Sequence, residues 1–241
     1  MQCRFNISGK FSPGDVVRID ALTDDGQYHA WAEVTVPQRP HEITDIDTVT
    51  VPLTQYYHTQ NYLRYKINIK DRPNENNFYR LIMDKQMTVK DYNNEIGEYV
   101  TQTTHRYHFI SREDVVLTDG QPTNSDDEDN GMFDTVKNIY GVFDDSRFKN
   151  TSYTMTVYNQ TNVEGLSKYG TNVKMDIIVR LLSITETEYY YLKALNLADS
   201  DAYDETINEP IKYPGNVHGG VGIVGISTET SKIIHIEKPW I

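Results

Sequence analysis

The sequence contains one cysteine and no long apolar run, and each of these scarcities excludes a class of protein. A single cysteine, Cys3, rules out an intramolecular disulfide framework. No stretch approaches the roughly 18 consecutive apolar residues of a membrane-spanning helix. Basic residues are also few, because 23 lysines and arginines face 35 acidic residues, for a formal charge of −12. This balance argues against a nucleic-acid partner, which needs a clustered basic surface.

The sequence is rich in tyrosine and in segments where apolar and polar residues alternate. Eighteen of the 241 residues are tyrosine, and apolar residues recur at every second position through much of the chain. This period is typical of strands. It predicts strands over 15–22, 28–36, 48–53, 62–70, 77–84, 105–110, 153–158 and 173–184. The last has the longest alternation, so we expect it at the centre of a sheet with both faces covered.

One segment has the pattern of a helix. Thr185 and Glu188 fit a capping box, in which each side chain bonds a backbone N–H at the helix start. An apolar stripe from Tyr191 to Ala198 follows at helical spacing. The sequence therefore predicts a helix near 186–199, packed on a sheet through Tyr189–Tyr191. One helix among many strands predicts an all-β protein.

The strand count also predicts how the chain divides. Three or four strands in the first 52 residues are about half of an immunoglobulin-like sandwich, which takes about seven strands and 100 residues. We therefore predict a partial immunoglobulin-like β-module at 1–54. A larger antiparallel β-sandwich or barrel domain, which contains the helix, is predicted at 55–241. The half-module either borrows strands from the rest of the chain or has lost its first half from this sequence.

Two motifs resemble ligand-binding sequences, a dinucleotide fingerprint and an EF-hand loop, but neither meets the requirements of its site. Gly220–Gly225 has the letters of a dinucleotide fingerprint, but only 16 residues follow it and the ribose-binding acid has no place. We interpret it as a glycine-rich strand. Asp126–Asp129 invites an EF-hand interpretation, in which Lys137 stands where a bidentate glutamate is required. A solvated acidic loop is the default there, and an irregular calcium site is the alternative.

No metal centre, cofactor or catalytic residue is predicted. His105 and His108 lie three apart on an expected strand, so they point to opposite faces and cannot share one ion. No paired cysteines, zinc-binding helix motif or nucleophile elbow is present. Carboxylates are abundant, and a glycosidase needs two of them across a cleft, but the sequence favours no particular pair.

Exposed aromatic residues are the remaining candidates for binding. Trp31, Tyr56, Tyr57 and Tyr62 lie near the expected module junction, where binding surfaces often form. Their rings could stack on sugars or on a partner's side chains. The alternative is that they are packing residues, half-buried between sheets.

Several segments together resemble a Bacteroidetes cell-envelope family, domain of unknown function 4249. The resemblance begins at Phe11–Ile19 and is most specific at Tyr189–Leu195, Glu209–Pro210 and Gly215–Gly225. It implies an exported outer-membrane lipoprotein that faces the periplasm or the cell exterior, often beside a TonB-dependent transporter. The family's signal sequence and anchor cysteine have no counterpart in these residues, so we expect an N-terminally truncated chain.

These observations predict a non-catalytic cell-envelope protein that binds a ligand or serves as an accessory partner of an outer-membrane transporter. A glycan or a peptide is the expected ligand, and any membrane attachment would come through a lipid anchor outside this sequence. A surface adhesin or structural protein is one alternative. A carbohydrate-active hydrolase is another, and it requires two carboxylates about 5 to 10 Å apart in an aromatic-lined cleft.

Overall fold

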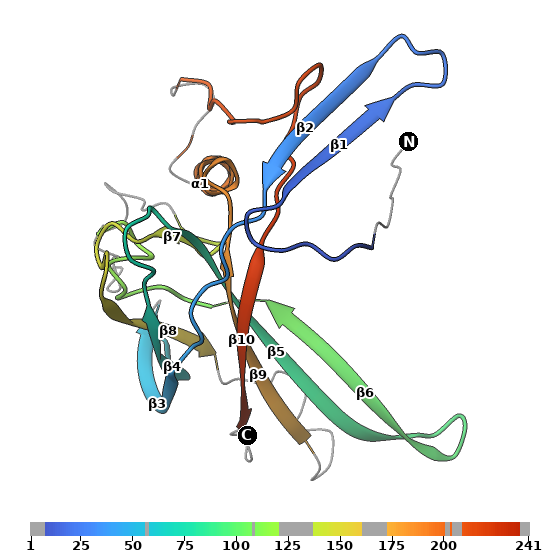
Figure 1. Ribbon diagram of the computed structural model, residues 1–241. Helices are drawn as coiled ribbons and strands as arrows, with labels where there is room; N and C mark the ends of the chain where they lie inside the picture. The colour runs from blue at the N-terminus through green and yellow to red at the C-terminus, as the bar shows by residue number, and fades with distance from the viewer. Residues whose placement is uncertain are drawn as a thin grey trace.

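The computed structural model describes residues 8–55, 58–107, 109–120, 137–160, 173–200, 203 and 209–236. Over these residues the chain forms ten strands and one helix. The strands make three antiparallel sheets, of two, three and five strands, and none of the three closes into a barrel in the part described (Figure 1). The prediction of a mainly β protein with one helix is confirmed.

The two-stranded sheet is a hairpin of β1 (Val16–Leu22) and β2 (His29–Thr35). Its turn forms at Asp24–Gly26, where Asp25 Oδ1 accepts a hydrogen bond of 3.1 Å from the backbone of Gln27. Aspartate and glycine favour such turns because they tolerate unusual backbone angles. The hairpin extends away from the other two sheets, so most of its side chains are exposed (Figure 1).

The other two sheets contain the remaining strands. The three-stranded sheet has the order β3-β4-β8, and the five-stranded sheet has the order β10-β9-β5-β6 with β7 paired to one end of β5. Their bounds are β3 Asp45–Gln55, β4 His58–Lys70, β5 Phe78–Asn93, β6 Glu98–Tyr107, β7 Val142–Asp144, β8 Ser152–Gln160, β9 Val173–Ser183 and β10 Thr228–Ile236.

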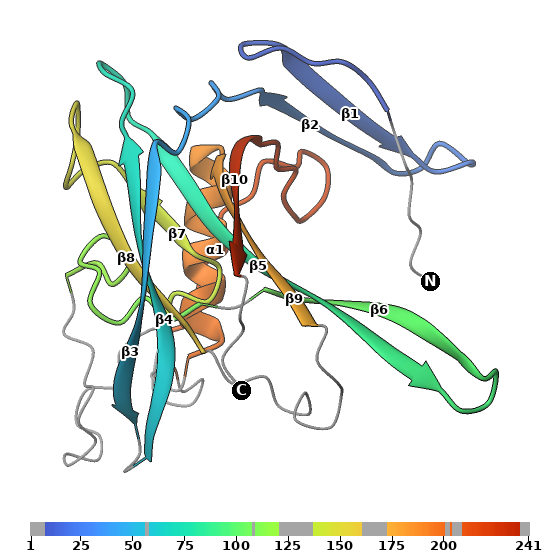
Figure 2. The ribbon, with the colours of Figure 1, turned by 90° about the horizontal axis from the view of Figure 1, so that it is seen from below.

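These two sheets pack face to face as a β-sandwich (Figure 2). Alternate side chains of β4, β8, β5 and β9 meet in one core, as the period-2 pattern requires. The core includes Tyr65, Ile67, Met155, Val157, Tyr79, Leu81, Met83, Met175, Ile177, Val179 and Leu181. Strand β9 lies between β10 and β5, so the prediction that it is central is confirmed.

The helix α1 (Glu186–Ala198) covers the face of the five-stranded sheet that points away from the sandwich core (Figure 2). It begins as predicted, with Thr185 Oγ1 accepting a 3.3 Å hydrogen bond from the backbone N–H of Glu188. The predicted stripe is displaced, because the buried helical residues are Tyr189, Leu192 and Asn196. Tyr190 is half exposed, and its ring contacts that of Phe78 on β5 at 6.2 Å between centroids.

The predicted return bond of the capping box is not formed. Glu188 Oε2 is buried and has no hydrogen-bond partner among the described residues. It lies against Gly225, where an added Cβ would come within 2.6 Å of that oxygen. Burial raises the pKa of Glu188, since the charged form loses its hydration. The carboxylate therefore packs under the C-terminal loop instead of capping the helix.

Three other predictions of local structure are wrong or incomplete. Gly220–Gly225 is an irregular loop and not a strand, held where Asn216 exchanges two hydrogen bonds of 2.8 Å with the backbone of Val224. Strand β6 occupies 98–107 instead of 105–110, because β5 continues to Asn93 and turns directly into it. Strand β10 was not predicted, since its N-terminal half is polar.

The predicted boundary between 54 and 55 falls one residue before the end of β3, and β3 pairs with β4, so the first segment is hydrogen-bonded to the second. The connection from β2 to β3 is itself tied to β10. Thr228 Oγ1 donates to the carbonyls of Pro37 (3.3 Å) and Gln38 (3.1 Å), and Lys232 Nζ donates to that of Thr44 (2.8 Å). The division into 1–54 and 55–241 stays a prediction.

Candidate functional site

Trp31 is the first of the predicted binding residues, and both faces of its indole ring are occupied. The ring of His218 is stacked on it at 4.1 Å between centroids, and the guanidinium of Arg18 lies 4.4 Å from its centroid. Two groups this close cannot share one side of the ring, so they cover opposite faces. Trp31 therefore offers no free face on which a sugar could stack.

The backbone around Trp31 completes a clasp between the N-terminal hairpin and the C-terminal loop. Trp31 and His218 exchange two backbone hydrogen bonds, of 3.0 and 2.8 Å. Gly219 comes so close to β2 that an added Cβ would lie 2.2 Å from the carbonyl oxygen of His29, and its φ of +73° also favours glycine. We call Trp31, His218 and Gly219 the loop clasp. Its contacts are structural.

Charged side chains surround the loop clasp on the same face of the hairpin. Arg18 bonds Asp20 at 2.8 Å and Glu33 at 3.3 Å, and His29 Nε2 lies 2.9 Å from Asp20. The hydrogen bonds from Arg18 and then from His29 lower the pKa of Asp20 to about 2. These groups are solvent-exposed, and exposed ion pairs contribute little to stability.

The other predicted aromatic residues do not join Trp31. Tyr62 lies on β4 in the three-stranded sheet and is 5% exposed, so it is a packing residue. Tyr56 and Tyr57 lie outside the described residues. Of the predicted binding residues that the structure describes, Trp31 therefore belongs to the loop clasp and Tyr62 is buried in the sheet.

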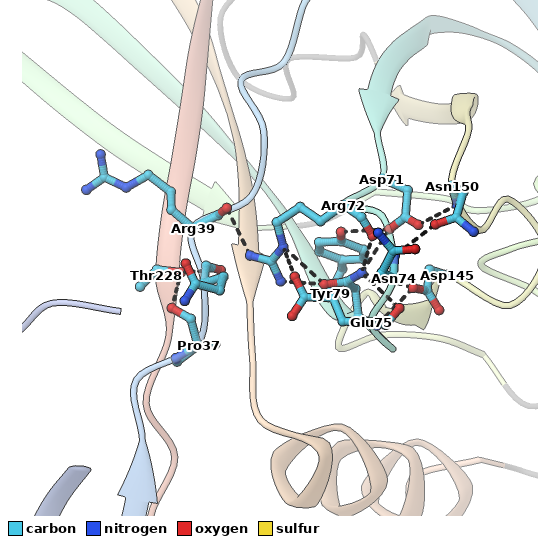
Figure 3. A network of polar contacts seen from close by, with 12 residues as sticks. Pro37, Arg39, Asp71, Arg72, Asn74, Glu75, Tyr79, Asp145, Asn150 and Thr228 are labelled. Atoms are coloured by element: carbon cyan, nitrogen blue, oxygen red, sulfur yellow. Dashed lines mark hydrogen bonds and ion pairs between the residues drawn. The ribbon is translucent and has the colours of Figure 1, made fainter. Parts of the chain in front are cut away.

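A buried polar network joins the start of β5 to the loop after β7 (Figure 3). The side-chain amide of Asn77 donates to Asp71 Oδ1 at 3.1 Å and to Asp145 Oδ2 at 3.0 Å. Asp71 also accepts from the hydroxyl of Tyr79 (3.1 Å) and the backbone of Asn150 (2.8 Å). Both carboxylates are at most 3% exposed, so they are structural acceptors and not a catalytic pair open to a substrate.

Arg72 extends this network to the β2-β3 connection. Its guanidinium donates to the Asn77 side-chain oxygen, pairs with Glu75 at 2.9 Å and donates to the carbonyl of Arg39 at 3.0 Å (Figure 3). Arg72 thus joins the β2-β3 connection to the β-sandwich. Sequence reasoning missed this network, since no motif marks it.

A cavity of about 550 Å³ lies beside α1, and it has the dimensions of a ligand site. It is bordered by the turn near 117–119, the stretch at 138–142, one side of α1 and the segment 209–212. Its apolar walls are formed by Leu117, Val142, Ala194, Leu197, Pro210 and Ile211. None of the lining residues in the described part is aromatic. We call this the helix cavity.

Two asparagines form a rigid part of the cavity wall. Asn138 Nδ2 donates to the carbonyls of Leu117 (3.0 Å) and Val142 (2.7 Å). Asn196 Nδ2 donates to Asn138 Oδ1 at 3.0 Å, and Asn196 Oδ1 accepts from the backbone of Tyr140 at 3.2 Å. These amides are fixed by one another, so they give the cavity a pre-formed shape.

Charged groups of both signs line the helix cavity. Lys193 Nζ lies 2.7 Å from Asp119 and 5.3 Å from the ring centroid of Tyr189. Glu209 and Lys212 come from the opposite segment, and Lys212 has no ion-pair partner within the described ranges. Burial raises the pKa of Tyr189, which stays protonated and donates to Asp144 at 3.0 Å. Lys193 and Asp119 pair with each other, so Glu209 and Lys212 are the charged lining groups placed to meet a ligand.

The remaining candidates give no site in the part of the chain that is described. Asp126–Asp129 and His108 lie outside it, and so does Cys3. Over the residues that are described, no group of three or more His, Cys, Asp or Glu side chains could hold a metal ion. In the same residues the helix is not long and apolar enough to cross a membrane.

A family model for a domain of unknown function (DUF4249) matches residues 2–233. The chain belongs to the DUF4249 family. The match covers nearly the whole chain, so the resemblance found in the sequence is confirmed. No curated protein matches this DUF4249 chain. All three of the most specific segments of the resemblance now have positions. Lys193, Ala194, Glu209 and Pro210 line the helix cavity, and 215–225 supplies His218 and Gly219 of the loop clasp.

Proposed function

We propose that this DUF4249 protein is a non-catalytic binding protein of the cell envelope and that the helix cavity is its ligand site. The observation that carries the proposal is the cavity itself, with a volume of about 550 Å³ and a wall fixed by paired asparagines. Ligand sites are typically pre-formed and concave, with apolar walls and a few polar groups. The envelope location rests on the family resemblance.

A short peptide fits this cavity better than a glycan. Sugar sites rely on flat aromatic rings, and the described walls of the helix cavity are aliphatic. Lysines and carboxylates stand on both sides of it, in the pattern that would meet the two charged ends of a short peptide. Each charge-assisted contact of this kind is stronger than a neutral hydrogen bond.

The accessory role beside an outer-membrane transporter is a further part of the proposal, and it is supported by the family resemblance alone. Its test is co-purification from outer membranes under mild detergent. We expect one transporter to be recovered repeatedly with the tagged chain. Recovery of no envelope protein in repeated trials would remove the transporter from the proposal and leave the ligand site untouched.

Binding is tested by a thermal-shift screen with a defined library of tri- to pentapeptides and, in parallel, a set of soluble oligosaccharides. We expect peptides to raise the melting temperature, with affinities then measured by isothermal titration. The variant Ala194→Trp should fill the cavity and abolish the response. Glu186→Trp, an exposed change in the first turn of the same helix, should keep it. Silence from every peptide would contradict the proposal, and a response to oligosaccharides alone would replace the ligand class.

A further inference from the structure

Strand β6 is an edge strand of the described five-stranded sheet, and it has no lysine, proline or bulge. It pairs only with β5 in the described part of the chain, and both views place it at the margin of the molecule (Figures 1 and 2). Proteins normally blunt such edges with lysine, proline, a bulge or a covering segment. Residues 98–107 contain no lysine or proline, and ten consecutive pairs with β5 show no bulge.

The β5-β6 ribbon also carries exposed aromatic side chains away from the sandwich. Tyr99 and Tyr107 of β6 are 67% and 63% exposed, and Ile96 in the turn is 59% exposed. Tyr92 and Tyr99 make an edge-to-face pair with centroids 5.2 Å apart. Exposed rings on an open strand edge are a surface suited to another strand.

The charges on β6 are arranged unevenly along the strand. Glu98 is at its start, and Arg106 is near its end with His105 beside it. Arg106 stands directly across from Lys85 on β5, and like charges in opposite positions destabilise a sheet. Burial, and then the charge of Arg106, lower the pKa of Lys85. The end of the ribbon near Arg106 therefore carries two like charges side by side, which an acidic residue on a partner strand would offset.

We propose that β6 pairs antiparallel with the β6 of a second copy of this chain, so that Glu98 of each copy faces Arg106 of the other. In this two-fold register Val100 lies opposite Thr104, Thr101 lies opposite Thr103, and residue 102 is on the axis. Opposite residues share a face of the sheet in antiparallel pairing, and these pairs satisfy that requirement. The register is self-complementary in charge, which is what an isologous interface requires.

Sedimentation equilibrium of the full chain tests the proposal, with a dimer expected at twice the 27.9 kDa of one chain. Glu98→Arg and Arg106→Glu should each weaken dimerisation at least about tenfold, because each places like charges opposite. The double variant should restore the wild-type dissociation constant to within about threefold. Within one chain these residues are eight positions apart, roughly 26 Å along a strand, so only pairing between copies explains such a rescue.

Asp47→Arg on β3 is the matched control, since it reverses an exposed acidic charge on the edge strand of the other sheet. It should leave the dimer unchanged. Circular dichroism should show native β structure for all four variants. A wild-type chain that is monomeric at every concentration overturns the proposal, even if the same edge captures an added peptide strand. A double variant no better than the single ones, or an equal loss with Asp47→Arg, overturns it as well.

Discussion

The substitution Asn77→Ala tests the polar network at the start of β5. Asn77 is 2% exposed, and its amide nitrogen is the donor shared by Asp71 (3.1 Å) and Asp145 (3.0 Å). Removing it leaves two buried carboxylates with one donor fewer each. Asp71 keeps the Tyr79 hydroxyl and the backbone of Asn150, and Asp145 keeps the backbone N–H of Asn77.

The magnitude follows mainly from those two lost contacts, and the substitution also removes the side-chain oxygen to which Arg72 donates. A hydrogen bond to a charged group contributes about 1.5 to 3 kcal/mol, and a buried carboxylate left short of a donor also costs its desolvation. Entry of water offsets part of this, so we expect the free energy of unfolding to fall by about 3 to 5 kcal/mol. Such a loss is a large share of the roughly 5 to 15 kcal/mol by which most proteins are stable.

Urea unfolding at neutral pH, followed by circular dichroism, measures this loss. The neighbouring Asn76→Ala is the matched control, because Asn76 is exposed and its side chain bonds only Lys149 in the described residues, at 2.5 Å. That variant should change the free energy of unfolding by less than about 0.5 kcal/mol. If Asn77→Ala costs no more than Asn76→Ala, the network does not hold this junction and the reasoning is refuted.

Two further substitutions test the C-terminal loop. Gly219→Ala should destabilise the chain by more than about 2 kcal/mol in the same assay, because its Cβ would collide with a backbone carbonyl, whereas Gly26→Ala at a similar φ in open space should cost about 1 kcal/mol. Equal losses would contradict the close approach. Glu188→Gln should stabilise the chain at pH 7 and make no difference near pH 4. The pKa of Glu188 is higher in the folded chain than in the unfolded chain, so ionisation of this carboxyl at neutral pH opposes folding. A constant difference across that pH range would show that burial of the charge is not the cause.

The strands that could be predicted from the sequence are those in which buried apolar side chains alternate with less buried ones along the strand. β9 has apolar residues at every second position, and the sandwich buries them in that order. β6 and β10 depend on their neighbours. The threonine-rich β6 is a strand because β5 continues beside it, and β10 alternates only at its end, at Ile234 and Ile236. The helix was predicted from its cap, but three consecutive tyrosines have equal apolar character. Only in the folded chain is Tyr189 distinguished, because it is buried and its hydroxyl donates to Asp144, whereas Tyr190 is half exposed.

The candidate site could not be predicted from spacing, because its parts meet only in the folded chain. Asn138 and Asn196 are 58 residues apart and belong to no motif, yet they bond at 3.0 Å. Trp31 was selected as an exposed aromatic residue, and the sequence could not show that Arg18 and His218 would cover both faces of its ring. The useful signal was the family resemblance, whose segments at 189–195 and 209–210 supply part of the cavity wall.

The claim that the helix cavity binds the ligand, while Trp31 is structural, is tested most directly by isothermal titration. One responding peptide from the library is titrated into the wild type, Ala194→Trp and Trp31→Ala under identical conditions. We predict that Ala194→Trp loses binding at a wild-type melting temperature, and that Trp31→Ala melts at a lower temperature yet binds with the wild-type dissociation constant. Loss of binding in Trp31→Ala with full binding in Ala194→Trp would contradict it.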